Sequence, residues 1–253
     1  MKTSLGVILA LAGCLAAMPA YAQEQVTVKW NDPSRPGLLK VNWHNGSIVV
    51  KTHSGNDVTV STSGGSNPRR EPAEARGLRR IDSGLGRLVI DSDNNNVIMI
   101  SSSSNVGAGS IEIEVPVKTN LNLESHNGAR VSVDGVEGDI EVTNHNGSVN
   151  VANVAGSVVA YSHNGQVNVS FRDITAGKPM SFTSMNGNVN VTLPPTAKVD
   201  LRMRTDNGGI WTGFDIQTKP STGDRTTFGT INGGGATIEL RSHNGNIYLK
   251  KAQ

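Results

Sequence analysis

Apolar and polar residues alternate with a period of two along most of the chain. Between residues 140 and 151, for example, apolar residues stand at Ile140, Val142, Val149 and Val151, with mainly polar residues between them. The same alternation occupies residues 111–115, 121–125, 158–162, 167–169, 238–242 and 247–249. Alternation of this kind is typical of strands with one buried face. Since no stretch after residue 22 carries a helical period of apolar positions, the pattern predicts an all-β protein.

The alternating segments are separated by a repeated tripeptide, His-Asn-Gly. It occurs at residues 44–46, 126–128, 145–147, 163–165 and 243–245, and Met-Asn-Gly at 185–187 and Asp-Asn-Gly at 206–208 take the same place. From His126 to Asp206, successive motifs are 18 to 22 residues apart. Each unit also has a second turn with a glycine, such as Gly138, nine residues before Gly147. One unit is therefore two short strands and two turns.

Two architectures fit these units. One is a β-solenoid, similar to a parallel β-helix, with coils of 18–22 residues and Asn-Gly turns. The other is an antiparallel β meander, in which each Asn-Gly forms a hairpin. Val136, Val154 and Ile174 at the second turn favour the solenoid, because a solenoid corner can bury them and a hairpin apex would expose them. A solenoid also stacks each coil on the next, whereas a meander leaves exposed edges. We expect the solenoid, with the meander as the alternative.

The N-terminal residues predict export. Lys2 precedes an apolar run at residues 5–17, and Ala20-Tyr21-Ala22 is a small-x-small site, so residues 1–22 are expected to be a cleaved signal peptide. The alternative is a lipoprotein anchored through Cys14, since Leu11-Ala12-Gly13-Cys14 resembles a lipobox. Residues 23–253 are expected to form a single repeat domain, periplasmic or extracellular, with an irregular arginine-rich loop at about 64–80. No later apolar run approaches the ~20 residues of a transmembrane helix.

Charge and cysteine content exclude several classes of function. The 23 basic and 21 acidic residues leave a net charge of +2, which lacks the basic field of a nucleic-acid-binding protein. Cys14 is the single cysteine and lies in the expected signal peptide. The exported chain would then have no thiol for a disulfide, a nucleophile or a metal ligand.

A family resemblance rests on two consecutive runs, residues 111–128 and 136–147. A Val-Pro pair, Val115-Pro116, leads into short strands that end in Asn or Ser followed by Gly, and a looser copy begins at Leu193-Pro194. These runs resemble the bacterial "putative adhesin" family of β-strand-repeat proteins. The resemblance covers about residues 85–250 and, more weakly, 38–62. It implies an exported or envelope-associated domain of unknown function, with no defined ligand or catalytic residue.

The histidines of the repeat form one candidate site. If the coils stack in register, His126, His145 and His163 lie on an outer edge, each about 5 Å from the next. Met185 and Asp206 continue the row, with His44 and His243 near its ends. Neutral imidazoles suit Zn, Ni or Cu, so the row is a candidate metal site. The alternative is that each histidine only flanks a turn, whose Asn-Gly pair supplies left-handed backbone geometry.

The outward side chains form a second candidate site. Asn150, Asn168 and Asn190 occupy equivalent outward positions, and Trp211 and Tyr248 take the same position in later units. Amides hydrogen-bond sugar hydroxyls and aromatic rings stack on sugar rings, so these residues are candidates for glycan binding. The alternative is a solvated sheet face.

The patterns of catalysis are missing from the sequence. Ser125 and His126 are neighbours, but strand alternation directs them to opposite faces. Glycoside hydrolysis requires a pair of carboxyl groups, whereas the acidic residues of this sequence are scattered. We therefore expect a non-enzymatic exported protein without a cofactor, an adhesin or a cell-envelope binding or structural module. Its expected partner is an envelope glycan or other cell-surface component, and no nucleic acid. The alternatives are a carbohydrate-active enzyme on a short β-helix and metal capture by the histidines.

Overall fold

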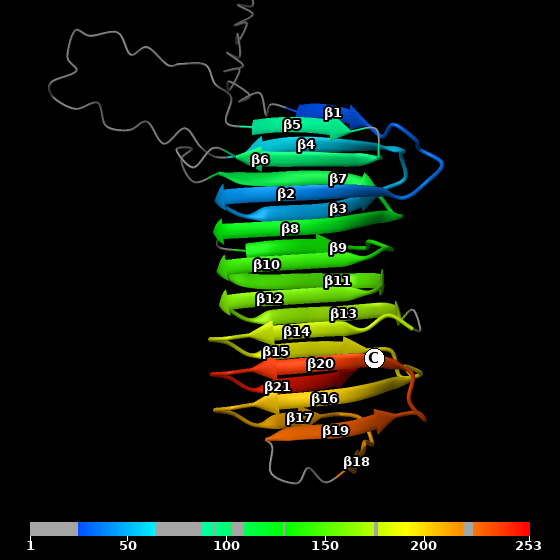
Figure 1. The fold of residues 1–253 in the computed structure, drawn as a ribbon, viewed down its shortest axis with the longest axis vertical. Helices are drawn as coiled ribbons and strands as arrows, with labels where there is room; N and C mark the ends of the chain where they lie inside the picture. The colour runs from blue at the N-terminus through cyan, green and yellow to red at the C-terminus, as the bar shows by residue number, and fades with distance from the viewer. Residues whose placement is uncertain are drawn as a thin grey trace, which may run out of the picture.

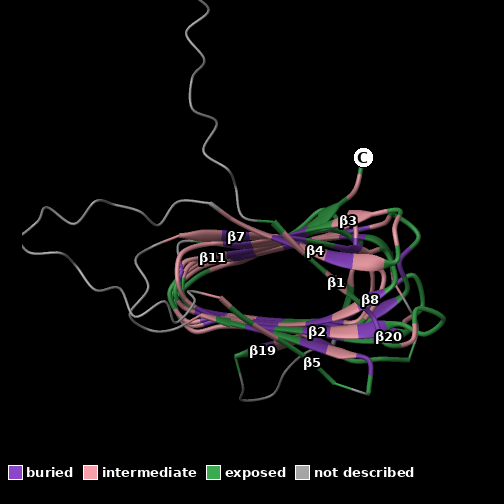
Figure 2. Cartoon of the chain, turned by 90° about the horizontal axis from the view of Figure 1, so that it is seen from above, coloured by how far each residue is buried: buried purple, intermediate pink, exposed green. Residues whose placement is uncertain are grey.

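The chain folds into two β-sheets that face each other across a narrow core (Figures 1 and 2). The computed structural model describes residues 25–63, 88–93, 95–102, 109–128, 130–174, 177–219 and 225–253. These residues contain strands and turns and no helix, so the predicted all-β class is confirmed. The expected signal peptide at 1–22, Cys14 and the arginine-rich loop at 64–80 lie outside the described residues.

Each sheet runs the length of the stack. In spatial order, sheet A contains β1 (Gln25–Lys29), β4 (Asp57–Ser63), β7 (Ser110–Pro116), β3 (Ile48–His53), β9 (Arg130–Asp134), β11 (Ser148–Gly156), β13 (Val167–Ile174), β15 (Val189–Leu193), β21 (Ile247–Lys251) and β17 (Ile210–Thr212). Sheet B contains β18 (Gln217–Lys219), β19 (Thr226–Ile231), β16 (Val199–Thr205), β20 (Ala236–Ser242), β14 (Met180–Ser184), β12 (Val158–Asn164), β10 (Ile140–Asn146), β8 (Thr119–Asn127), β2 (Gly37–Asn45), β6 (Val97–Ser102) and β5 (Leu88–Asp93).

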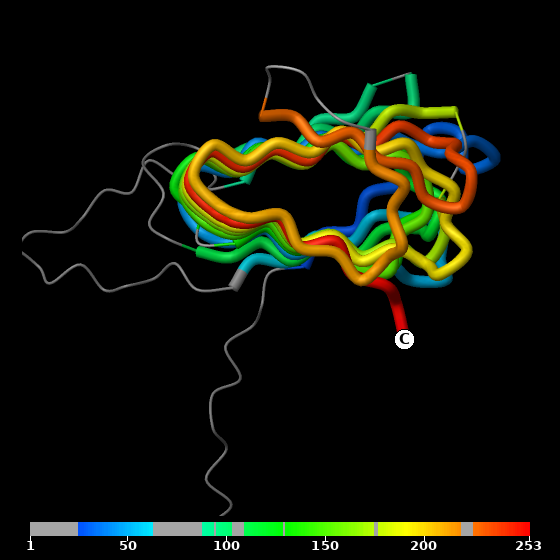
Figure 3. The backbone as a smooth tube through the Cα atoms, turned by 90° about the horizontal axis from the view of Figure 1, so that it is seen from below, coloured from blue at the N-terminus to red at the C-terminus, as the bar shows by residue number. Residues whose placement is uncertain are grey.

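Parallel pairing between successive coils confirms the solenoid. In sheet B, β8, β10, β12 and β14 pair in parallel, and in sheet A the same holds for β9, β11, β13 and β15. Viewed along the stack, the coils lie over one another (Figure 3). The meander is therefore wrong. Antiparallel pairs occur near the two ends of the stack, among β1, β4 and β7, between β5 and β6, and among β16, β18 and β19, so both sheets are mixed.

The core is built from the inward half of each alternating strand. Val142, Val151 and Val169 are buried, while their immediate neighbours along each strand are less buried and face outward. Buried and exposed positions alternate around the coils in Figure 2. Val136 and Val154, at the second turn, are fully buried, as expected for a solenoid corner. Because each coil contributes the same kind of apolar residue, the core continues unbroken from one coil to the next.

Two coils are inserted out of chain order. The coil of β2 and β3 lies between that of β6 and β7 and that of β8 and β9, and the coil of β20 and β21 lies between that of β14 and β15 and that of β16 and β17. In Figure 1 these insertions appear as a blue pair among green strands and a red pair among yellow ones. The chain therefore skips one coil position between β7 and β8, and again between β15 and β16.

The two connections that pass over an inserted coil each begin at a proline, in the Val-Pro and Leu-Pro dipeptides noted in the sequence. Pro116 follows Val115 and Pro194 follows Leu193, each at the end of a strand in sheet A. The Thr119 hydroxyl donates to the Pro116 carbonyl at 2.7 Å, and the Ala197 amide donates to the Pro194 carbonyl at 3.0 Å. Proline cannot donate to a strand ladder, so it suits the point at which the chain leaves its sheet. The Val-Pro signature of the sequence therefore marks the passage over an inserted coil.

Side-chain donors, most of them buried, close the corner next to the His-Asn-Gly motif. Each donates a hydrogen bond to a glycine carbonyl of the neighbouring coil: Ser162 to Gly147 at 2.9 Å, Ser184 to Gly165 at 2.8 Å, Ser242 to Gly187 at 2.9 Å, Thr205 to Gly245 at 2.7 Å, and the Trp43 indole to Gly109 at 3.0 Å. These bonds satisfy backbone carbonyls at a turn, where the regular sheet ladder ends.

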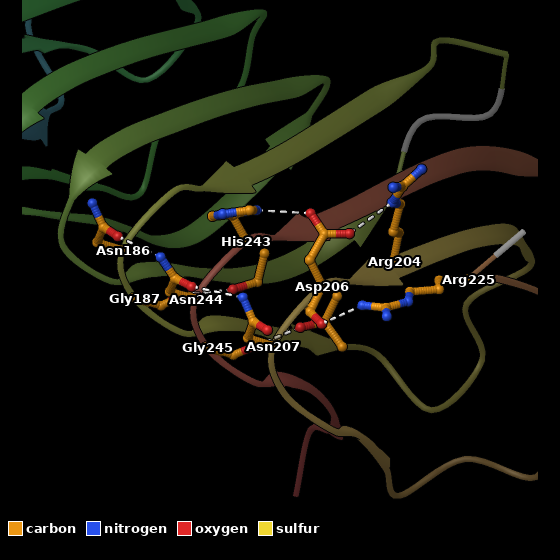
Figure 4. Close-up of polar contacts among 11 residues, drawn as sticks. Asn186, Gly187, Arg204, Asp206, Asn207, Arg225, His243, Asn244 and Gly245 are labelled. Atoms are coloured by element: carbon orange, nitrogen blue, oxygen red, sulfur yellow. Dashed lines mark hydrogen bonds and ion pairs between the residues drawn. The ribbon is translucent and has the colours of Figure 1, made fainter.

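The motif asparagines form a second ladder on the outside of the same corner. Side-chain amides bond from Asn146 to Asn127 at 3.2 Å, and at 2.9 Å from Asn164 to Asn146, Asn186 to Asn164, Asn244 to Asn186 and Asn207 to Asn244. Figure 4 shows the last two of these bonds. The ladder crosses the inserted coil without a break, so stacking in space, not order along the chain, determines its members.

The motif glycines serve mainly close packing. Gly46 and Gly147 have φ values of 121° and 138°, the left-handed geometry that the sequence suggested. Gly165, Gly187 and Gly245 do not have a positive φ. A Cβ at these three positions would instead lie 2.3–2.4 Å from a glycine carbonyl oxygen of the adjacent coil. The interpretation of the Asn-Gly turns as left-handed is therefore wrong at these positions, where glycine lets two backbones approach.

Candidate functional site

The outer face of sheet A brings together the five residues predicted for binding. Strand register places Asn150, Asn168, Asn190, Tyr248 and Trp211 side by side in that order. Tyr248 precedes Trp211 because β21 belongs to the inserted coil. We call this row the amide face.

The three asparagines of the amide face are hydrogen-bonded to one another. The Asn168 amide donates to Asn150 Oδ1 at 2.7 Å, and the Asn190 amide donates to Asn168 Oδ1 at 2.8 Å. A hollow of about 430 Å³ lies over them, lined by Asn150, Val151, Ala152, Gln166, Asn168, Val169, Ser170, Asn190, Thr192 and Lys250. The polar groups of this lining are amides, hydroxyls and one ammonium, and no lining residue is a carboxylate.

The two aromatic residues extend the amide face beyond the hollow. Trp211 is 61% exposed, the most exposed large hydrophobic side chain among the described residues. The Tyr248 hydroxyl accepts a hydrogen bond from the Asn246 amide at 3.1 Å, and Lys250 Nζ lies 6.0 Å from the centre of the Tyr248 ring. Tyr248 therefore has side-chain partners in the structure, whereas the side chain of Trp211 is largely exposed.

The histidines lie side by side at the His-Asn-Gly corner, at the ends of the sheet B strands, as the stacking predicted. In spatial order the row contains His44, His126, His145, His163, Met185, His243 and Asp206. We call it the histidine row. The His44 and His126 ring centres are 4.6 Å apart, and those of His126 and His145 are 5.3 Å apart with nearly parallel planes.

The contacts within the histidine row single out one group of possible metal ligands. Glu124 Oε1 lies 3.4 Å from His126 Nε2, and one ligand atom each from Glu124, His126 and His145 lie within 4.8 Å of one another. His163 instead lies beside Tyr161, with its Nδ1 3.3 Å from the Tyr161 hydroxyl oxygen. Sequence reasoning named His163 and missed Glu124. The signal for Glu124 was its place two residues before His126, on the same face of an alternating strand.

The other end of the histidine row is an ion-pair cluster (Figure 4). His243 Nδ1 lies 2.8 Å from Asp206 Oδ2, and Arg204 Nε lies 3.1 Å from Asp206 Oδ1. The Arg225 guanidinium donates to the Asp206 carbonyl at 2.8 Å. The hydrogen bond from His243, followed by that from Arg204, lowers the pKa of the Asp206 carboxyl below its ordinary value of 3.8.

Comparison with known proteins identifies the family. The chain matches Toastrack DUF4097 over residues 39–250. The protein belongs to the Toastrack family. This membership confirms the resemblance that residues 111–147 carry, and the family is one of unknown function. No curated protein matches the Toastrack chain.

Three solved structures are similar to this Toastrack protein. A putative cell adhesion protein from Clostridium sporogenes is 12% identical, with a TM-score of 0.46, over 91% of this chain and 100% of that one. A putative adhesin from Bacteroides fragilis is 12% identical, with a TM-score of 0.29, over 90% and 97% of the two chains. A putative adhesin from Parabacteroides merdae is 9% identical, with a TM-score of 0.29, over 91% and 96%.

No helix that could span a membrane is found in the part of the Toastrack chain that the structure describes.

The Asp206 cluster makes a pH-dependent contribution to the stability of the Toastrack domain. Since the folded-state pKa lies below 3.8, the contribution is complete above that pH and is lost as the pH falls through the folded value. We expect Asp206→Asn to lower the melting temperature at pH 7, and to lower it progressively less as the pH falls below 3.8. Melting curves of both proteins between pH 2 and 7 measure this. A difference in melting temperature that stays constant across the range would contradict the assignment.

Proposed function

We propose that this Toastrack protein is an exported, non-enzymatic module that binds a glycan of the cell envelope through the amide face. The observation that carries the proposal is the hollow itself. It lies over the asparagine row that the sequence singled out, and its polar lining consists of neutral hydrogen-bonding groups with Lys250 as the one charge.

The asparagine ladder leaves hydrogen-bonding capacity for a ligand. A side-chain amide has two N–H donors and an oxygen with two lone pairs. Within the ladder, Asn168 uses one donor toward Asn150 and one lone pair toward Asn190. One donor and one lone pair therefore remain, and neighbouring rungs repeat them at the strand spacing of about 4.8 Å. Such a repeated pair of donor and acceptor suits a chain of hydroxyl-bearing sugars laid along the stack.

Trp211 supplies the apolar part of the same surface. Sugar rings present C–H faces that stack on aromatic rings, and the exposed indole follows Tyr248 at the end of the asparagine row. A ligand that crosses from the hollow to Trp211 would meet hydrogen bonds first and a stacking platform at its end.

The lining of the hollow supports binding without catalysis. Glycoside hydrolysis uses two carboxyl groups on either side of the scissile bond, and no residue that lines the hollow carries a carboxyl group. Export is part of the proposal because residues 1–22 have the pattern of a signal peptide.

Co-sedimentation tests the proposed function. The purified protein would be mixed with isolated peptidoglycan, outer-membrane vesicles and whole cells, and the bound fraction measured against protein concentration. We expect saturable binding to one of these fractions, with competition by soluble glycan fragments released from it. Absence of saturable binding to all three fractions would overturn the proposal.

A further inference from the structure

One corner of the solenoid holds buried polar atoms without hydrogen-bond partners. Among the described residues these atoms are His44 Nδ1, Ser125 Oγ and Asn144 Oδ1. They belong to three successive coils, and Ser125 and Asn144 directly precede His126 and His145. A buried polar group without a partner loses its hydrogen bonds to water and gains none in return, so three such groups at one corner call for an explanation.

The sequence shows why this corner differs from the others. Val131 comes five positions after His126, whereas Val149 comes four positions after His145, although Val131 and Val149 pair in register. The coil of β8 therefore has one additional residue at its His-Asn-Gly turn. Ser162 and Ser184 donate regularly to glycine carbonyls of the neighbouring coil, but Ser125 Oγ and Asn144 Oδ1, at the equivalent positions, have no partner. This break in the regular hydrogen bonding lies beneath the closest imidazoles of the histidine row.

The donor set at this corner matches a metal site. Glu124, His126 and His145 offer one carboxylate oxygen and two imidazole nitrogens within 4.8 Å of one another. Two histidines and one glutamate are a known protein ligand set for Zn²⁺, with a further position left for water or another ligand. His44 is a further imidazole beside this donor set, with its ring centre 4.6 Å from that of His126.

The geometry requires only a small side-chain adjustment. Zn–N bonds of about 2.0–2.1 Å place two tetrahedral ligand atoms about 3.4 Å apart. Glu124 Oε1 and His126 Nε2 are already 3.4 Å apart, and since all three ligand atoms lie within 4.8 Å of one another, the remaining pairs must approach by at most about 1.4 Å. The side chains of His126 and Glu124 are 34% and 42% exposed, and His145 is exposed, so ring and carboxylate rotation is not blocked by core packing.

Glu124 is held in place by a neighbouring coil. The Asn42 amide donates to Glu124 Oε2 at 3.1 Å, while Oε1 lies toward His126. An outer hydrogen bond of this kind orients a ligating carboxylate and supports metal affinity. Asn42 belongs to β2 of the inserted coil, as does His44, so the out-of-order stacking places both beside the donor set.

We infer that Glu124, His126 and His145, with His44 beside them, form a binding site for a divalent transition-metal ion, Zn²⁺ in particular. None of these residues lines the hollow of the amide face, so the site is tested independently of the proposed glycan binding. It differs from the metal site expected from the sequence, because Glu124 takes the place of His163.

Calorimetric titration of the purified, metal-stripped protein with ZnCl₂ tests the inference. We expect one ion per chain, bound at micromolar concentration or tighter, and a higher melting temperature with the ion present. His126→Ala and His145→Ala should each weaken binding at least tenfold, and Glu124→Gln, which keeps an acceptor for Asn42, severalfold. The matched control is His163→Ala, which removes an imidazole from the next coil and should retain the wild-type affinity.

The affinities of the variants distinguish binding at Glu124, His126 and His145 from binding anywhere along the histidine row. Wild-type affinity in all three ligand variants, or no measurable Zn²⁺ binding by the wild-type protein, would overturn the inference. An equal loss of affinity in His163→Ala and His145→Ala would also overturn it, because the ion would then bind along the row. Circular dichroism of each variant confirms that the solenoid is intact, and Glu124→Gln tests the site even if a histidine variant fails to fold.

Discussion

Val151→Asp is expected to prevent the solenoid from folding. Val151 is 2% exposed and pairs in register with Val133 on one side and Val169 on the other, in the middle of sheet A. An aspartate there would bury an unpaired charge among apolar side chains, which we expect to lower the free energy of unfolding by more than about 4 kcal/mol. Since the core continues from coil to coil, the damage should extend beyond one coil. Urea denaturation followed by circular dichroism measures the loss.

Asn150→Asp is the matched control for this substitution. It introduces the same side chain one residue earlier, on the outward side of the same strand. Asn150 Oδ1 accepts the hydrogen bond from Asn168, and an aspartate retains an oxygen at that place. We expect a change below about 1 kcal/mol. If the two substitutions destabilise the protein equally, the assignment of inward and outward faces on β11 is wrong.

Gly187→Ala is expected to destabilise the stack by about 3 kcal/mol. A Cβ at this position would lie 2.4 Å from the Gly165 carbonyl oxygen and 2.6 Å from its carbon. Both are backbone atoms of the adjacent coil, so no side-chain rotation relieves the overlap. The two coils would have to separate at the corner, which would also strain the nearby bond from Ser184 to Gly165. Thermal and urea unfolding of the variant measure the effect.

Gly213→Ala is the control for the glycine substitution. The nearest atom to a Cβ at Gly213 is the Lys251 backbone nitrogen at 3.8 Å, an ordinary contact distance, and the residue does not have a positive φ. We expect the stability of this variant to stay within about 0.5 kcal/mol of the wild-type value. If Gly187→Ala is equally harmless, close approach of coils is not the reason for glycine in the motif.

The sequence was sufficient to predict the coil but not the order of the coils. Alternation around Val142 and Val151 and the buried turn residue Val154 determine how one coil folds and which side faces the core. The same pattern occurs in every coil, so it does not specify which coil stacks on which. The insertion of β2 and β3, and of β20 and β21, depends on contacts between distant segments. In the sequence, the connections that pass over the inserted coils are marked by Pro116 and Pro194.

For the candidate sites, too, the sequence predicted the positions within a coil but not the contacts that depend on how the coils stack. The amide face follows from period-two alternation within a known repeat, and the structure places its residues side by side. Glu124 could not be preferred over other outward acids, because its proximity to His145 depends on strand register and side-chain direction. The role of His44 depends on the inserted coil, which the repeat alone does not reveal.

The most direct test of the account compares amide-face variants in the envelope fraction that binds the wild-type protein. We expect Asn168→Ala combined with Trp211→Ala to weaken co-sedimentation at least tenfold. The control, Tyr161→Ala combined with Thr183→Ala, removes an aromatic and a polar side chain from the outer face of sheet B and should bind like the wild type. Equal binding by both double variants and the wild-type protein would contradict the central claim that the amide face is the binding surface.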